Sequence, residues 1–319
     1  LSLRRQRQMC IRDRPCYEST FECNQCGNDR YEEECEGCDG CDDDEESDSA
    51  GIHSYSYKPK PIFNFNEPIR PTYFLGLELE VECTNDDYDR SSCTTFTLET
   101  LNKNESSEDA FYLKSDGSLN FGYEIVSHPH SLSAMQAVKW DALLPNLIKM
   151  GVRSWDRSNC GIHVHVSRTA FGTSMPQSAN HLIRFNKMIY DNQRQVERIA
   201  GRSSSYASFS DKGRVIRKVK NSSQSNGRYS AVNLDNVNTV EVRIFKGSLR
   251  KERILSAVEF THAMVEFTRI MKIVPKQAPF AWARFVSYVT DHSDIYPNLF
   301  IIMNETFQRE QQPTTQEGN

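Results

Sequence analysis

An alternation of apolar and acidic residues runs through Gly76-Leu77-Glu78-Leu79-Glu80-Val81-Glu82. The same alternation, with imidazoles or a Glu and Arg pair as the polar members, recurs in Cys160-Gly161-Ile162-His163-Val164-His165-Val166 and in Val240-Glu241-Val242-Arg243-Ile244-Phe245. A period of two is typical of a β-strand, because successive side chains of a strand point to opposite faces of the sheet. Each stretch therefore predicts a strand with one apolar face and one polar face.

The polar face of the first strand carries three carboxylates, those of Glu78, Glu80 and Glu82. At a rise of about 3.3 Å per residue, neighbours in this row lie roughly 7 Å apart and repel one another. Such a row must be either fully solvated or neutralised by cations. If the two histidines of the second stretch and Glu241 and Arg243 of the third line the same cavity, the neutralising partners are metal ions and an anionic ligand. This combination indicates phosphate chemistry.

The composition is that of a soluble globular protein, since 38% of the 319 residues are apolar and 25% are charged. This length suits one large domain or two smaller ones. No apolar run approaches the roughly 20 residues of a membrane-spanning helix, and no secretory signal is visible, so we expect a cytoplasmic protein without a membrane partner. The sequence opens on Leu1 rather than Met, and we expect residues 1–14 to be unstructured or non-native.

The net charge of −5 argues against a protein whose whole surface binds nucleic acid. The charge is unevenly distributed, because twelve acids and a single Arg lie between Asp29 and Asp48. The segment 202–220 is basic and includes Arg202 and Lys212. It could close over the phosphates of a nucleotide, and an equally good alternative is a loop that faces solvent or nucleic acid.

Seven of the ten cysteines lie within the first 41 residues. Four of them form two C-x-x-C pairs separated by eight residues: Cys23, Cys26, Cys35 and Cys38. Each pair can present two thiolates from one tight turn, which favours a tetrahedral Zn²⁺ site over a disulfide in a chain without a secretory signal. Residues 15–41 therefore predict a small zinc-ribbon-like module. Two further cysteines close by leave open which four would bind the metal.

The remaining chain divides by composition into a linker, a folded domain and a tail. Residues 42–68 combine an acidic run with scattered prolines, which is linker composition. A folded domain is expected at 69–305 and a polar tail at 306–319. We expect strands at 73–82, 123–127, 228–234 and 238–246, helices at 131–149, 178–199, 250–271, 279–290 and 294–308, and loops at 83–110 and 201–227. This order predicts an α+β fold in which helices pack on one face of an antiparallel sheet and a ligand binds the other.

Four motifs follow one another along the chain. They are Gly76-Leu77-Glu78-Leu79-Glu80, Asp116-Gly117-Ser118-Leu119 with Gly122-Tyr123-Glu124-Ile125-Val126-Ser127, Cys160-Gly161-Ile162-His163-Val164-His165-Val166, and Thr239-Val240-Glu241-Val242-Arg243-Ile244-Phe245. In this order they resemble the amidoligase family, carboxylate–amine ligases similar to glutamine synthetase and glutamate–cysteine ligase. The resemblance covers about residues 70–272. It implies a curved antiparallel sheet of the glutamine synthetase type, whose concave face holds ATP and Mg²⁺ or Mn²⁺.

The resemblance also implies roles for individual side chains. The implied metal ligands are Glu78, Glu80, Glu124, His163 and Glu241, with the first two on different ions. By the same resemblance, His165 would contact phosphate and Arg243 would hold the phosphoryl group during its transfer. Asp116 would bind either the amine or a metal ion.

The implied reaction is ATP-dependent formation of an amide. ATP phosphorylates a carboxylate to an acyl phosphate, and an amine then displaces the phosphate. Phosphoryl transfer needs positioning and neutralisation of charge, which divalent cations and an arginine provide. One departure from glutamine synthetase is Thr239, where that enzyme carries an Arg. The acceptor pocket of that enzyme also has no recognisable counterpart, so amino acids, peptides and polyamines all remain open as substrates.

Two other functions fit parts of this sequence. The segment 15–41 could recognise nucleic acid or a protein partner beside a ligase-like domain that has no activity. Alternatively, His163 and His165 with nearby glutamates could form the metal site of a hydrolase. Metal content separates this last alternative, because a hydrolase of this kind would hold one zinc ion beyond the ribbon and the ligase would hold magnesium weakly.

Overall fold

An antiparallel sheet organises the larger of the two units into which the chain divides, residues 1–47 and 48–319. A computed structural model describes residues 21–22, 29–30, 51–84, 90–104, 110–155, 157–209, 212–220, 229–271 and 278–311. In the smaller unit, β1 (Phe21–Glu22) pairs antiparallel with β2 (Asp29–Arg30). The predicted cysteine ligands of zinc lie outside the described residues.

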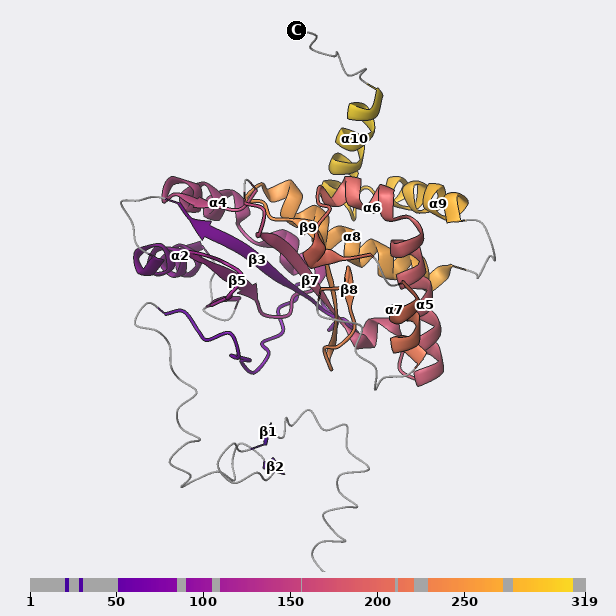
Figure 1. Ribbon diagram of the computed structural model, residues 1–319, viewed down its shortest axis with the longest axis horizontal. Coiled ribbons are helices and arrows are strands. Elements are labelled where there is room, and N and C mark those ends of the chain that lie inside the picture. The colour runs from indigo at the N-terminus through magenta and orange to yellow at the C-terminus, as the bar shows by residue number, and fades with distance from the viewer. Residues whose placement is uncertain are drawn as a thin grey trace, which may run out of the picture. The chain divides into compact units, whose positions relative to one another are not determined.

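The sheet of the larger unit has the strand order β4-β5-β3-β7-β9-β8, with β6 paired to the end of β3. Its strands are β3 (Leu75–Cys83), β4 (Phe111–Lys114), β5 (Gly122–Ser127), β6 (Val152–Arg153), β7 (Gly161–Ser167), β8 (Val232–Asn233) and β9 (Thr239–Lys246). All pairings are antiparallel. The three alternating stretches of the sequence are thus β3, β7 and β9, which lie side by side (Figure 1).

Helices cover the apolar face of this sheet. The helical elements are α2 (Arg90–Asn104), α3 (Leu132–Ala137), α4 (Trp140–Lys149), η3 (Arg168–Phe171), α5 (Met175–Asp191), α6 (Gln193–Ala200), η4 (Ser205–Ala207), α7 (Lys212–Lys220), α8 (Lys251–Ile270), α9 (Ala278–Asp291) and α10 (Pro297–Gln311). Leu77 and Leu79 of β3 and Val164 of β7 are buried in one core with side chains of α8 such as Val258 and Phe260. The α+β prediction, an antiparallel sheet with helices, is confirmed.

A bulge lies in β9 where it pairs with β7. Ile162 is opposite Phe245 and Val164 is opposite Val242, so β9 has one more residue than β7 over this interval. Ile244 and Phe245 are consecutive, yet both are buried in the core. A bulge bends its strand and increases the local twist. The bulged interval includes Arg243 and so affects where its side chain points.

Two segments expected to be loops contain helices. Helix α2 lies within 83–110, where the Ser- and Thr-rich sequence suggests no helix, and α7 lies within 201–227. Tertiary packing explains α2: Cys93 and Leu101 are buried, and the Thr97 hydroxyl hydrogen-bonds to the Tyr123 hydroxyl at 2.6 Å. In α7, Val215 is buried in the core. Both predictions of a loop were therefore wrong.

The two helices expected before β7 and after it are each divided. The first, at 131–149, is interrupted at Val138 and Lys139 between α3 and α4. The second, at 178–199, begins earlier than expected and changes from α5 to α6 at Asn192. The Ser131 hydroxyl caps α3 by accepting a hydrogen bond from the Ala134 amide at 3.2 Å. Helix positions were thus predicted better than their ends.

The described part of the expected linker follows the outer edge of the sheet. The His53 amide donates to the Leu113 carbonyl and the Ser115 amide to the His53 carbonyl, both at 2.9 Å. The Asn64 amide donates to the Pro129 carbonyl at 2.8 Å. This segment therefore extends the pairing at β4. None of the described helices is both long enough and apolar enough to cross a bilayer.

Candidate active site

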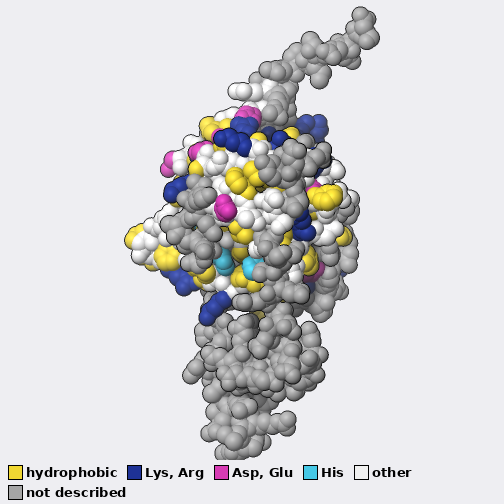
Figure 2. Space-filling model, turned by 90° about the vertical axis from the view of Figure 1, so that its left-hand side faces the viewer, with side chains coloured by type: hydrophobic (Ala, Val, Ile, Leu, Met, Phe, Trp, Pro, Cys, Tyr) yellow, Lys and Arg dark blue, Asp and Glu magenta, His cyan; other side chains and the backbone are white. Residues whose placement is uncertain are grey.

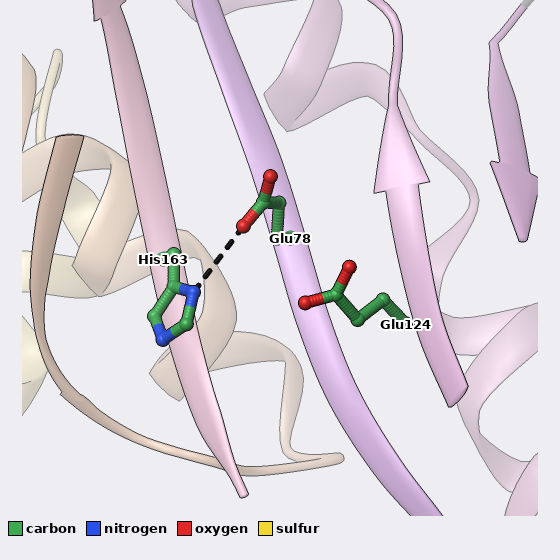
Figure 3. A group of neighbouring side chains, drawn as sticks. All are labelled: Glu78, Glu124 and His163. Carbon is green, nitrogen blue, oxygen red and sulfur yellow. Dashed lines mark hydrogen bonds and ion pairs between the residues drawn. The ribbon is translucent and has the colours of Figure 1, made fainter. Parts of the chain in front are cut away.

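The register of the central strands brings the polar side chains together on the face opposite the helices. The pairs that face each other are Glu78 with His163, Glu80 with Glu124, and His165 with Glu241. Figure 3 shows Glu78, Glu124 and His163 projecting from three neighbouring strands to the same side of the sheet. The alternation in the sequence predicted this shared face, because each polar residue is two positions from the next.

The imidazole of His163 lies at the centre of this face and is 3% exposed. Its Nδ1 is 3.2 Å from Glu78 Oε2 and 3.6 Å from Glu241 Oε1, and its Nε2 is 3.6 Å from Glu80 Oε1. One ring therefore contacts carboxylates from two other strands. Three carboxylates around a single ring concentrate negative charge, which suits a site that binds metal cations.

The second histidine of β7 lies between two carboxylates that raise its pKa. His165 Nε2 is 3.1 Å from Glu78 Oε1, and its Nδ1 is 3.1 Å from the Thr239 hydroxyl. Burial lowers the pKa of His165, but the charges of Glu78 and Glu241 outweigh burial and raise it to about 9. Burial likewise opposes ionisation of Glu78, and the neighbouring histidines outweigh it and hold the pKa of that carboxyl well below its usual value.

On β9, Glu241 is hydrogen-bonded through both carboxylate oxygens. Arg243 donates to Oε1, while the side-chain amides of Asn233 and Asn236 donate to Oε2 at 2.9 and 3.2 Å. The Nε of Arg243 is buried and has no hydrogen-bond partner in the described structure. A buried guanidinium N–H without an acceptor is costly, so this atom is suited to an oxygen of an anionic ligand.

Glu80 is fixed by the backbone at the start of β7. The Gly161 amide donates to Glu80 Oε2. A side chain at 161 would collide with the guanidinium of Arg202, because a Cβ there would lie 2.1 Å from its NH1. The same guanidinium donates to the Phe245 carbonyl at 3.4 Å. The absence of a side chain at Gly161 thus lets Arg202 approach the acidic residues.

The carboxyl of Glu124 lies between those of Glu78 and Asp116 and is 4% exposed. Burial, followed by the charges of Glu78 and Asp116, raises the pKa of Glu124 to about 10. Asp116 lies in the turn between β4 and β5, and its Oδ1 accepts a hydrogen bond from the Ser118 amide at 2.6 Å. Burial raises the pKa of Asp116, but hydrogen bonds from Ser118 and Glu124 outweigh it and leave the pKa below its usual value.

Three overlapping groups of these side chains could each hold a metal ion. They are Glu78, Glu124 and His163; Glu78, His165 and Glu241; and Glu80, Asp116 and Glu124. Within each group the ligand atoms lie within 4.8 Å of one another. Carboxylates predominate in all three, and oxygen ligands are those that Mg²⁺ prefers, while imidazole also suits Mn²⁺. The donor set and the protonated Glu124 both fit divalent cations, which would replace the proton.

The family model described as "Putative amidoligase enzyme" matches residues 69–265. The chain belongs to the amidoligase family. A solved structure described as "Apo GmaS without ligand" is similar to this chain with 11% sequence identity and a TM-score of 0.39, over 77% of this chain and 71% of that one. No curated protein matches the sequence.

In this amidoligase, all predicted ligands on the sheet and Asp116 lie in the three groups, and Arg243 and Arg202 lie beside them. Lys212, predicted to bind the nucleotide, begins α7, and its side chain is outside the described part of the structure. Arg243 and Arg202 therefore lie beside the cluster, and the roles of Arg243, Arg202 and Lys212 stay proposals.

Sequence reasoning missed several partners of the amidoligase cluster. Asn233 of β8 and Asn236 of the turn that follows it donate to Glu241. β8 has only two residues, and the strand predicted at 228–234 gave no sign that an amide there would bind a carboxylate of β9. Tyr112 of β4 lies close enough to Glu78 and Glu124 that, after burial, their charges raise its pKa. The alternation Phe111-Tyr112-Leu113-Lys114 was a signal that could have identified Tyr112 as a residue of the polar face.

The alternative of nucleic-acid binding through residues 15–41 lies largely outside the described residues, so the surface of the larger unit bears only on binding by that unit. Figure 2 views the molecule from the left-hand side of Figure 1. On the coloured part of this face, basic and acidic side chains are interspersed among polar and apolar ones. Nucleic-acid binding usually requires a continuous basic patch or stripe. The described residues of this face do not form one.

Proposed function

We propose that this chain is an ATP-dependent carboxylate–amine ligase that forms an amide through an acyl phosphate and uses Mg²⁺ or Mn²⁺. The observation that carries the proposal is the set of three overlapping ligand groups on one face of the sheet, next to the unpartnered Nε of Arg243. Membership of the amidoligase family supports the ligase class. Buried carboxylates of like charge are stable together only with a proton or a cation between them.

We assign different roles in phosphoryl transfer to the acidic and the basic residues of the sheet. Divalent cations held by the acidic groups would neutralise charge on the phosphate oxygens. Arg243 donates its free Nε–H to an oxygen of the transferring phosphoryl group, and His165 lies on the neighbouring strand beside Glu241. Arg202, whose guanidinium lies at the Gly161 end of β7, would be a further donor to phosphate oxygens. These contacts stabilise the negative charge on the phosphoryl oxygens in the transition state, when the group lies between ADP and the substrate carboxylate.

The proposed reaction has two steps. A carboxylate oxygen of the substrate attacks the γ-phosphorus of ATP, the bond to the bridging oxygen breaks, and ADP leaves. The neutral amine then attacks the acyl carbon of the acyl phosphate, the bond from that carbon to the phosphate oxygen breaks, and inorganic phosphate leaves with a proton from the amine as the amide bond forms. Closely placed cations and donors lower the barrier mainly by positioning and charge neutralisation.

The test is release of inorganic phosphate from ATP in the presence of Mg²⁺ and a panel of amino-acid and peptide carboxylates with ammonium or primary amines. Amide formation is followed by mass spectrometry. Glu80→Gln should reduce the rate by about a hundredfold or more, because it weakens a metal ligand and its bond from the Gly161 amide. Asp294→Asn, in an exposed turn, is the charge-matched control and should leave the rate unchanged.

A different outcome would favour the hydrolase alternative. If the protein retains one tightly held zinc ion beyond any bound by the N-terminal segment, releases no phosphate from ATP and cleaves amide substrates, the ligase proposal is wrong. Measuring metal content and phosphate release on the same preparation separates the two chemistries.

A further inference from the structure

Glu82, the third acid of β3, has a different set of contacts from Glu78 and Glu80. Its side chain belongs to none of the three ligand groups and is 5% exposed. Its Oε1 accepts hydrogen bonds from the Asn120 amide at 2.9 Å and from the Asn159 side-chain amide at 2.8 Å. Its Oε2 accepts one from the Phe121 amide at 2.9 Å. Both carboxylate oxygens of Glu82 are thus occupied as acceptors.

The three hydrogen bonds join two loops that border the acidic cluster. Asn120 and Phe121 belong to the turn between β4 and β5, the turn that carries Asp116. Asn159 belongs to the loop between β6 and β7, which ends at Gly161. The Asn159 side chain also donates to the Ser118 carbonyl at 3.2 Å, so the two loops are connected directly as well as through Glu82.

We propose that Glu82 is a positioning residue that holds Asp116 in place for the ligand group it forms with Glu80 and Glu124. The inference rests on the proposed function in one respect, that a divalent cation uses this group. Asp116 is the one member of the group that comes from a turn rather than from a strand. A turn residue keeps a ligand geometry only when neighbouring bonds fix it, and such supporting bonds typically change metal affinity by about 10- to 100-fold.

The substitution Glu82→Gln tests this role with almost no change in shape. It replaces one acceptor oxygen by an amide NH₂, which must then face a donor: the Phe121 amide in one orientation, the Asn120 and Asn159 amides in the other. At least one hydrogen bond is lost and two donors oppose each other. The turn should loosen while the strand itself stays paired.

Helix α8 offers a matched control. Glu259 is also fully buried and also accepts three hydrogen bonds: from the Leu299 amide at 2.7 Å and from the side-chain amides of Gln136 and Asn298 at 2.9 and 2.6 Å. It lies in the helical layer, and none of its three donors belongs to the cluster. Glu259→Gln therefore causes a comparable loss of hydrogen bonding without touching the turn that carries Asp116.

The first measurement is Mn²⁺ affinity of the whole protein by electron paramagnetic resonance. Glu82→Gln should weaken Mn²⁺ binding by about tenfold or more, and Glu259→Gln should leave it unchanged. In an Asp116→Asn background, Glu82→Gln should have almost no further effect, because a residue that acts through Asp116 adds nothing once that ligand is lost. Unchanged affinity in Glu82→Gln, or fully additive effects of the two substitutions, would overturn the proposal.

The second measurement needs neither metal nor nucleotide. Hydrogen exchange at the amides of 116–121 should become faster in Glu82→Gln and stay at the wild-type rate in Glu259→Gln. Equal protection of this turn in wild type and Glu82→Gln would refute the positioning role even if Mn²⁺ binds. Absence of Mn²⁺ binding by the wild-type protein would instead contradict the proposed function, so the two failures are distinguishable.

Discussion

At the scale of single residues, two side chains of the cluster hold protons that a bound cation would displace. Burial and the neighbouring carboxylates raise the pKa of Glu124 to about 10, and Glu78 holds the pKa of His165, despite burial, at about 9. A metal ligand must be deprotonated. At neutral pH, binding of a cation by either residue therefore releases a proton.

Mn²⁺ affinity should consequently rise with pH between 6.5 and 8.5. Because both pKa values lie above this range, each proton released increases the affinity by up to about tenfold per pH unit. Glu124→Gln removes one of the two groups and should lower the slope of log affinity against pH by up to one unit. Calorimetry with Mn²⁺ in buffers of different ionisation enthalpy counts the protons directly.

A flat affinity over this range, or an affinity that falls as pH rises, would contradict the assignment of these residues as ligands. An unchanged slope in Glu124→Gln would contradict the role of Glu124 in particular. His163→Gln is a useful comparison, because that ring has contacts with three carboxylates of the cluster and its loss should weaken binding at every pH.

The sequence placed the cluster on one sheet face, because the alternation in β3, β7 and β9 assigns each side chain to a side before any register is known. The sequence could not reveal which atoms of these side chains contact one another. The bond from the Gly161 amide to Glu80 depends on how β7 begins relative to β3, and the contact of Asn233 with Glu241 depends on the pairing of β8 with β9. Both are properties of the assembled sheet.

At the scale of secondary-structure elements, the start of β5 is tightly packed against β3. A Cβ at Gly122 would lie 2.2 Å from the Val81 carbonyl oxygen and 2.8 Å from the Leu119 Cβ. The carbonyl oxygen belongs to the backbone of a paired strand, so it cannot move aside as the end of a flexible side chain can. Gly122→Ala should therefore displace β5 and lower the free energy of unfolding by about 2 kcal/mol or more, measured from urea denaturation midpoints.

The neighbouring Gly117 provides the control, since a Cβ there would meet no atom within 4 Å. Gly117→Ala should change the free energy of unfolding by less than about 0.5 kcal/mol. Equal stability of the two variants would show that the close approach of β5 to β3 is not as described. The comparison is internal to one hairpin, so differences in chain entropy between glycine and alanine largely cancel.

Elements with a clear period were predicted well, and those stabilised by distant contacts were not. The alternation in β3 identifies that strand from its own residues. Helix α2 has no such pattern, because its buried residues include Thr97, a polar side chain whose partner is Tyr123 in β5. A contact that links an unpatterned segment to a strand formed later in the chain cannot be read from local sequence.

At the scale of the whole molecule, the sequence predicted a domain organised around one sheet, and the family match over 69–265 falls within it. The prediction succeeded because the strands carry apolar side chains on one face and polar side chains on the other, which is a property of composition along each strand. The zinc-ribbon-like module of residues 15–41 stays a prediction, since the cysteines predicted to bind zinc lie outside the described residues.

The central claim is that the polar face of the sheet binds a nucleotide through divalent cations. Calorimetric titration of the full chain with ATP tests it most directly, once with excess Mg²⁺ and once with a chelator. We predict saturable binding that requires Mg²⁺ and is weakened at least tenfold in Arg243→Ala, which removes the buried guanidinium beside the cluster. Absence of ATP binding with Mg²⁺, or equal binding with the chelator, would contradict the account.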